Sequence, residues 1–337
     1  MVEINLLYIF IGSIGFDLLI GDPRFIIHPV QIIGFYINKT TNLLLYNFRE
    51  NKRILFWGGL VLSLSTIFIS FSFGKVIELN YFQSKGNFFS GILILLGLSS
   101  CIASKGLISS VKEISNLIEN REINKKSERI IKEKVQRIVS RDVSSSSLEH
   151  LLRSSTESLT ENSVDGIFGP LFWIFVGLIC IKFSIFLPGP LSLGFSYKAI
   201  STMDSMIGYK YDHYRYLGFF SAKIEDNFTF IPSRLVLLTL PLVSSNITNY
   251  MKIIKNSYID GKKYDSPNSG ISEAVFAYIS DIRLGGSSKY NNRIINKPII
   301  NPNGQICTGE KINLICKLIL KLEFLWITFF ILIFFIT

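Results

Sequence analysis

The run ILFWGGLVLSLSTIFISFSF, Ile54 to Phe73, contains no charged side chain. A helix that spans a lipid bilayer needs about 20 consecutive, predominantly apolar residues, and this run has that length. We therefore expect a transmembrane helix here. The composition agrees, because 48% of the 337 residues are hydrophobic and 28 of them are Phe, which is too apolar for an ordinary soluble enzyme.

Further apolar runs raise the expected number of membrane-embedded helices to between four and six. Leu322 to Ile336 and Phe88 to Ala103 are the stronger runs, and the weaker ones are residues 4–16, 167–187 and 235–243. Because Glu3 stands where a signal peptide has basic residues, we expect the first run to remain as a membrane anchor. The predicted fold is all-α, a multi-pass integral membrane protein with large helical polar loops.

No stretch separates as a soluble domain, so the sequence predicts one membrane-embedded domain over residues 1–337. Its polar parts are a helical region at 105–165, a motif region at 197–234 and a C-terminal motif at 266–286, before a last membrane helix at 318–336. Leu107, Val111 and Ile114 recur at helical spacing within the first of these.

The charge of the chain points to a membrane instead of to nucleic acid. The formal net charge is +10, from 35 Lys and Arg against 25 Asp and Glu. Residues 121–141 hold eight basic and three acidic side chains, as cytoplasmic loops do. No nucleic-acid recognition motif accompanies the charge. The four Cys show no metal-ligand spacing, so we expect them to be reduced packing residues.

Arg153, Glu157, Glu161 and Asp165 follow one another at steps of four, which places them on one slowly drifting side of a helix. The three carboxylates repel one another, most strongly where water is scarce. Something positive should therefore lie opposite them, and either a metal ion or basic side chains would serve. Asp142 or one of Ser144 to Ser147 is the expected cap of this helix.

Two polar clusters precede or overlap that helix. The first is Asp22, Arg24 and His28, with prolines fixing the turn; it also fits the capped end of a transmembrane helix. The second is VSRD, Val139 to Asp142, joined to the acidic face; it also fits a surface network of salt bridges. The two interpretations of each cluster stay open at this point.

Two more clusters lie toward the C-terminus. The third, within Tyr197 to Arg234, mixes carboxylates, amides and basic groups, which suits phosphate together with magnesium. The fourth begins with the turn SPNSG, Ser266 to Gly270, and leads into a helix whose first N–H groups favour an anion. Glu273 lies one turn into that helix, and an ordinary helix cap would explain the same turn.

Six ordered motifs together resemble the adenosylcobinamide-phosphate synthases, the CobD/CbiB family of cobalamin biosynthesis. The motifs are GDPRFIIHPV, VSRD, TESLTENSVDGIFGPLFW, YKAISTMDSMIGY, IEDNFTFIPSRL and SPNSGISEA, and they extend over most of the chain. The chain departs from the family pattern at Ser140, at Ser155 and Thr156, at Glu225 and at Tyr264, where the family usually has His. The change at Tyr264 argues against an essential His there.

The resemblance implies an enzyme, an ATP-dependent acid–amine ligase of the cell inner membrane whose active site faces the cytoplasm. It would join aminopropanol phosphate, or aminopropanol, to the free propionate of adenosylcobyric acid, using ATP and Mg²⁺. The implied partners are that corrinoid, the amine and membrane lipid, with no nucleic acid. A homo-oligomer or a cobalamin-assembly complex is compatible with the sequence.

On this resemblance we assign roles to the clustered side chains. Phosphoryl transfer needs charge neutralisation and positioning. The catalytic set is Asp22, His28, Glu157, Glu161, Asp165, Asp204 and Asp226, and all of these except Asp22 and His28 are also the proposed magnesium ligands. The groups expected to bind phosphate, propionate or other parts of the substrates are Arg24, Arg141, Arg153, Asn162, Lys198, Arg215, Asn227, Arg234, Asn268 and Glu273. His28 or a spare carboxylate would accept the amine proton.

Topology raises one difficulty, because a fully spanning segment at Ile167 to Leu187 would put the second and third clusters in different compartments. Pro170, Lys182 and Pro188 suggest instead a broken or re-entrant helix that lines a polar cavity. The alternative function is a membrane transporter of a corrinoid or metal ion. The polar clusters lie at membrane edges and in loops, and no internal repeat is apparent, so we favour the enzyme.

Overall fold

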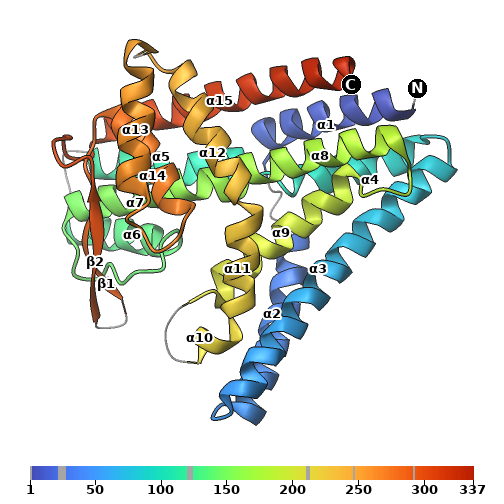
Figure 1. Cartoon of the computed structure of the whole chain (residues 1–337). Helices are drawn as coiled ribbons and strands as arrows, with labels where there is room; N and C mark the ends of the chain where they lie inside the picture. Colours follow the sequence, from blue (N-terminus) through green and yellow to red (C-terminus); the bar gives the residue numbers. More distant parts are fainter. Residues whose placement is uncertain (1, 22–27, 120–123, 210–212, 246, 291–292) are drawn as a thin grey trace. The chain divides into compact units, whose positions relative to one another are not determined.

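A computed structural model describes residues 2–21, 28–119, 124–209, 213–245, 247–290 and 293–337. The predicted all-α class is confirmed, because helices dominate these residues and they contain a single two-stranded sheet (Figure 1). The described chain divides into two compact units, each assembled from separate stretches of sequence. The prediction of a single domain stays a prediction.

Unit 1 contains residues 1–105, 165–229 and 327–337. Its helices are α1 (Val2–Leu19), α2 (Pro29–Phe48), α3 (Lys52–Gln83), α4 (Phe88–Ser99), α8 (Gly169–Phe183), α9 (Pro190–Ile207), α10 (Tyr214–Leu217) and α11 (Phe219–Phe228), with the end of α15 (Gly309–Ile336). Within it α9 packs against both α3 and α8, and α1 packs against α4.

Unit 2 contains residues 106–164 and 230–326. Its elements are α5 (Ser104–Glu119), α6 (Lys125–Gln136), α7 (Leu148–Ser163), α12 (Phe230–Thr239), the 3-10 turns η2 (Leu240–Val243) and η3 (Ile247–Asn249), α13 (Tyr250–Gly261), α14 (Ser269–Ser280), the strands β1 (Leu284–Tyr290) and β2 (Arg293–Ile300), and most of α15. A buried apolar cluster joins α5, α6 and α7 through Ile114, Ile131 and Leu151.

Among the residues that the structure describes, four helical stretches are long and apolar enough to cross a membrane, within the predicted range of four to six. They are Lys52–Gln83, Phe88–Glu119, Leu148–Phe183 and Gly309–Ile336. The weaker runs at 4–16 and 235–243 are not among them; α12 ends after only 10 residues. The protein is therefore a membrane protein by the length and composition of its helices.

The stretch Leu148–Phe183 changes character in the middle. A π-helical turn, η1 (Val164–Phe168), separates the polar α7 from the apolar α8, and Asp165 lies in this turn. Such single π-turns occur mostly inside α-helices and frequently at functional sites. The π-turn lies at the start of the predicted segment, and α8 continues without a break through Lys182 to Phe183, so a re-entrant helix and a polar cavity stay predictions.

Small residues and one buried carboxylate position α9 against α3. A Cβ at Gly74 would lie 2.7 Å from the Ser192 Cα, so only glycine permits this close approach. The buried Glu78 accepts hydrogen bonds from the backbone N–H groups of Leu191 and Ser192, at 2.7 and 3.0 Å. An α3 carboxylate therefore caps the first turn of α9, where the helix dipole favours negative charge.

We expect Glu78→Ala to lower the free energy of unfolding by roughly 3 kcal/mol, because it leaves the buried N–H groups of Leu191 and Ser192 without their acceptor and removes the ion pair with Lys75. Thermal unfolding in detergent would measure the change. The exposed Glu50→Ala is the matched control and should behave as the wild type. Equal stability of both variants would contradict the capping role.

Candidate active site

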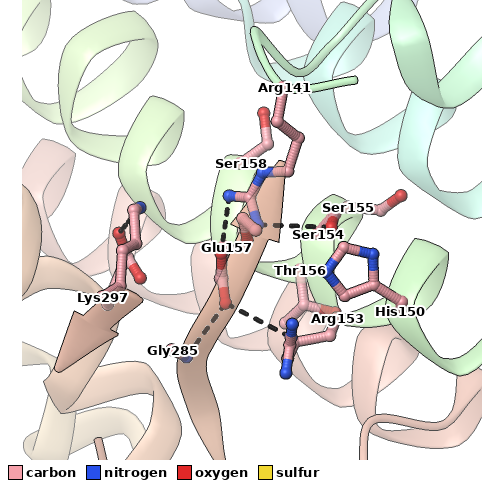
Figure 2. A network of polar contacts seen from close by, with 12 residues as sticks. Arg141, His150, Arg153, Ser154, Ser155, Thr156, Glu157, Ser158, Gly285 and Lys297 are labelled. Carbon is pink, nitrogen blue, oxygen red and sulfur yellow. Dashed lines mark hydrogen bonds and ion pairs between the residues drawn. The ribbon is translucent and has the colours of Figure 1, made fainter. Parts of the chain in front are cut away.

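Glu157, at the centre of α7, is the hub of a buried ion network in unit 2 (Figure 2). Ser147 caps this helix by accepting a hydrogen bond from the His150 N–H, which confirms a serine cap. The Glu157 side chain is only 1% exposed. Its Oε2 accepts from Arg141 Nη2 at 2.6 Å, and its Oε1 accepts from the Gly285 N–H at 2.9 Å. The positive group expected opposite Glu157 is therefore a basic side chain.

Arg141 reaches Glu157 from the turn that follows α6. Its Nη1 donates to Ser288 Oγ at 2.9 Å and to Ser154 Oγ at 3.3 Å, so both ends of the guanidinium are engaged. Only 6% of the Arg141 side chain is exposed. A buried ion pair of this kind tolerates its loss of solvent only because hydrogen bonds satisfy the remaining donors.

Arg153 lies on the other side of Glu157, with its Nε 3.8 Å from Glu157 Oε1. Its Nη2 donates to the Ser287 carbonyl oxygen at 2.9 Å, and a ring nitrogen of His150 contacts the same oxygen at 3.2 Å. In the described part of the chain, Arg153 Nε has no hydrogen-bond acceptor. The Arg153 side chain is 26% exposed, so this guanidinium retains donors for an incoming oxyanion.

A second carboxyl–cation pair lies close to the first. The fully buried Glu273 of α14 receives a hydrogen bond from the Tyr264 hydroxyl at 3.3 Å and contacts the Lys297 Nζ of β2 at 3.4 Å. Burial raises the pKa of Glu273 to about 8; Lys297 lowers it, while Glu157 and Glu161 act in the same direction as burial. Burial alone would lower the pKa of Lys297, but Glu273, Glu161 and Glu157 together raise it.

Glu161 is the least engaged carboxylate of this group. It is half-buried one turn beyond Glu157, and it has no hydrogen bond or ion pair with any residue that the structure describes. It acts electrostatically on Lys297, Glu273 and Tyr264. Among the described carboxylates around Lys297, Glu161 is therefore one that is available to a substrate or a metal ion.

The PNSG turn is held by Arg234 instead of being left open. Arg234 Nη1 donates to Asn268 Oδ1 at 2.6 Å, and its Nη2 donates to the Pro267 carbonyl oxygen at 2.9 Å. The predicted α14 follows directly, with Asn268 at its N-cap. The structure thus brings Arg234 and Asn268 together, and their hydrogen bond stabilises the start of α14.

Asn162, another predicted binding residue, donates to Ser158 Oγ at 2.9 Å.

The remaining predicted residues of the third cluster belong to unit 1. Asp165, Asp204 and Glu225 all act electrostatically on the buried Tyr197 hydroxyl, so these carboxylates gather around one phenol. Asp226 pairs with Lys223 at 3.4 Å. Arg215 and Asn227 are exposed, and Lys198 is half-buried on α9.

Of the first predicted cluster, Asp22 and Arg24 lie outside the described residues. His28 is the N-cap of α2, and its Nδ1 accepts a hydrogen bond from the Val30 N–H at 3.2 Å. His28 therefore caps the start of α2, whereas the capped end of the first apolar helix and the role of His28 as a base both stay predictions.

The structure also tests whether these side chains fit a metal ion. No three His, Cys, Asp or Glu side chains are grouped as metal ligands among the described residues. The oxygens of Glu157 are already occupied by Arg141 and Gly285, as the distances above show. The predicted magnesium set, Glu157, Glu161, Asp165, Asp204 and Asp226, therefore stays a prediction.

The β-hairpin is the part of the site that the sequence did not predict. β1 and β2 pair antiparallel, with an irregular register between Leu284 and Gly286. β1 supplies the Gly285 N–H, the Ser287 carbonyl and the Ser288 hydroxyl to the network, and β2 supplies Lys297. The Gly285–Gly286 pair, with the isoleucines of residues 294–300 further along the chain, was the available signal, since such glycines often mark a bulge.

We expect Gly285→Ala to disrupt the network, because a Cβ there would collide with the Pro298 carbonyl oxygen and because φ is +83°. The Gly285 N–H would then move away from Glu157. The expected loss is a few kcal/mol of stability, roughly 2–3, read from thermal unfolding. Gly106→Ala, where a Cβ meets nothing within 4 Å, is the matched control; equal destabilisation by both changes would refute the role of Gly285.

Comparisons with known proteins agree over most of the chain. Residues 10–319 match the family described as "CobD/Cbib protein". Three similar proteins are each named "Cobalamin biosynthesis protein CobD": one from Synechocystis sp. is 33% identical over 89% of this chain and 84% of its own length. One from Clostridium tetani is 32% identical over 94% of both chains, and one from Clostridium perfringens is 34% identical over 84% of both. No solved structure matches the chain.

Proposed function

Since this chain belongs to the CobD/CbiB family of cobalamin biosynthesis, we propose that it is an ATP-dependent ligase that forms adenosylcobinamide phosphate. It would join aminopropanol phosphate to the free propionate of adenosylcobyric acid, at the cytoplasmic face of the inner membrane. The observation that carries the proposal is the buried network of Arg141, Glu157 and Arg153, with Lys297 nearby. Such a site favours anionic ligands.

The chemistry needs an activated carboxylate, because a carboxylate and an amine do not condense readily in water. In the proposed first step, a propionate oxygen attacks the γ-phosphorus of ATP, which gives an acyl phosphate and ADP. In the second step, the amine attacks the acyl carbon and phosphate leaves, so that one amide forms and one proton is released. Charge neutralisation and positioning are the protein's main contributions to phosphoryl transfer.

Arg153 is the residue that we propose to contact the transferred phosphate. The Arg153 side chain is 26% exposed, so part of its guanidinium is accessible to an oxyanion, and guanidinium groups match phosphate oxygens well. We propose that Arg141 and Glu157 act as positioning residues, because both are buried and bonded to each other. Their pairing fixes β1, which in turn fixes Arg153 through the Ser287 carbonyl.

Magnesium remains part of the proposal as the ion that accompanies ATP. Mg²⁺ keeps several waters and commonly uses one or two carboxylates beside substrate phosphates, so a dedicated cage is not required. Glu161 fits that demand in unit 2, because its oxygens have no partner among the described residues. Asp165, Asp204 and Asp226 of unit 1 remain proposed ligands, and His28 remains the proposed acceptor of the amine proton.

The proposal is tested by incubating the purified protein with adenosylcobyric acid, ATP, Mg²⁺ and either aminopropanol phosphate or aminopropanol. We expect the mass of the amide product, formed only when ATP is present. Arg153→Gln should lower the rate by about 100-fold, since it removes a charged phosphate contact. Corrinoid uptake into vesicles without an amide product would instead favour a transporter.

A further inference from the structure

One end of unit 1 gathers exposed basic side chains next to a membrane span. Arg49, Lys52 and Arg53 are all exposed, with the exposed Glu50 as the one acidic side chain among residues 49–53, and this stretch immediately precedes the charge-free run that begins at Ile54. The helix α3 has 32 residues and is about 48 Å long, whereas the hydrocarbon core of a bilayer is about 30 Å thick. Part of α3 therefore extends into the headgroup layer.

The short helix α10 adds to the same end. Arg49 Nε donates to His213 Nε2 at 2.7 Å, and Lys52 Nζ lies 5.6 Å from the centre of the Tyr216 ring. Figure 1 shows α10 beside the α2–α3 pair. Arg215, between these two contacts on α10, is also exposed. We call Arg49, Lys52, Arg53 and Arg215 the basic end.

Aromatic side chains mark the same level of the helices. Trp57 lies one turn beyond Arg53 and is 61% exposed, and Tyr46, near the end of α2, is 90% exposed. The Phe56 ring packs on Phe220, with ring centroids 4.8 Å apart, and so ties α3 to α11 at this level. Exposed Trp and Tyr next to basic residues are typical of the boundary between the hydrocarbon core and the headgroups.

We propose that the basic end is a binding surface for the headgroups of anionic phospholipids. Four basic groups beside the start of a span attract a negatively charged membrane surface. The neighbouring apolar helix and the exposed aromatic rings favour a lipid over a soluble polyanion, because a lipid alone provides both a headgroup and an acyl chain at this depth. This surface shares no residue with the ion network of unit 2. Arg215 is also one of the residues expected to bind substrate, so the inference is tested at Lys52 and Arg53, which have no assigned role in the ligase reaction.

The basic end also indicates which side of the membrane the neighbouring end of α9 faces. Gly218, which follows α10, packs on the last turn of α9, since a Cβ there would collide with the Ile207 carbonyl oxygen. Asp204 lies one turn earlier on α9. Basic residues beside a span mark its cytoplasmic end. The basic end therefore brings the C-terminal turn of α9 to the cytoplasmic headgroup layer.

Native mass spectrometry on the full chain tests this surface with phosphatidylglycerol and phosphatidylcholine as the two probes. The test variant is Lys52→Gln/Arg53→Gln, which spares the Arg49–His213 hydrogen bond. We expect the wild type to retain phosphatidylglycerol in preference to phosphatidylcholine, and the variant to lose at least about fivefold of that preference. High salt should weaken it in the wild type.

The matched control is Lys125→Gln/Lys126→Gln on α6, which removes the same charge from another exposed basic stretch. It should keep the wild-type preference. The inference is overturned if the test variant retains phosphatidylglycerol as the wild type does, or if the α6 variant loses as much. Thermal unfolding of both variants in phosphatidylcholine identifies any loss that comes from misfolding. In that case the single variant Lys52→Gln serves as a second, milder test of the same surface.

Discussion

Arg141→Met should be the most damaging single change in unit 2, lowering the free energy of unfolding by roughly 3–5 kcal/mol. The change leaves the Glu157 carboxylate buried without its principal partner, which lies at 2.6 Å in the wild type. It also removes the hydrogen bond to Ser288, so β1 loses a contact with the network. Chemical unfolding in detergent and the amide-forming assay should both register the loss.

The double variant Arg141→Met/Glu157→Met separates stability from function. Replacing both members of a buried ion pair by apolar residues of similar volume is often neutral or stabilising. We therefore expect most of the lost stability to return, while amide synthesis stays at least about 100-fold below the wild type. Recovery of activity together with stability would mean that the pair has no part in the reaction.

Lys297→Met should destabilise the protein in a way that depends on pH. Burial raises the pKa of Glu273 from the ordinary 4.5 to about 8, so the folded state holds this proton more tightly than the unfolded state. Glu273 therefore favours folding most below pH 4.5, and this contribution is lost as the pH rises from there to about 8. Without Lys297, ionisation of Glu273 at higher pH leaves an unpaired buried charge.

The stability difference between the wild type and Lys297→Met should thus be small near pH 5 and reach roughly 3 kcal/mol near pH 9. Unfolding curves recorded across that range would measure it. Glu273→Gln/Lys297→Met is the matched control, because it has no carboxyl to ionise and should remove the pH dependence. A difference that is constant with pH would contradict the pairing of Lys297 with Glu273.

The membrane helices were predictable because their signal lies in local composition. The charge-free run from Ile54 and the C-terminal apolar run both lie within candidate spans, as does the run that begins at Phe88. The starts of two helices were also predictable from sequence, because a serine is the N-cap of α7 and Asn268 is the N-cap of α14. Apolar length and capping chemistry depend on neighbours in the sequence, so they need no knowledge of distant contacts.

The hairpin was not predictable in the same way. The stabilising partners of β1 lie more than 100 residues away, on α7 and in the VSRD turn. No sequence pattern indicated that Lys297 would pair with Glu273. Strand formation depends on packing against neighbours more than on intrinsic preference, which explains why these residues were missed.

The contact between the VSRD motif and the acidic face of α7 was predicted, whereas the chemistry expected of the site stays a prediction. The steps of four on α7 required a positive group opposite Glu157, and Arg141 of the VSRD motif supplies it. The two motifs are thus correctly associated. Whether a carboxylate binds a metal ion or an arginine depends on the geometry of distant segments, and spacing along one helix does not contain that information.

Activation of the propionate as an acyl phosphate is the central step of the proposed reaction, and an isotope experiment tests it most directly. Adenosylcobyric acid carrying a heavy oxygen isotope in its free propionate would be converted to product with ATP and aminopropanol phosphate. Activation as an acyl phosphate predicts that one labelled oxygen appears in the released inorganic phosphate. Label in AMP, or amide product with no label in phosphate, would contradict the mechanism.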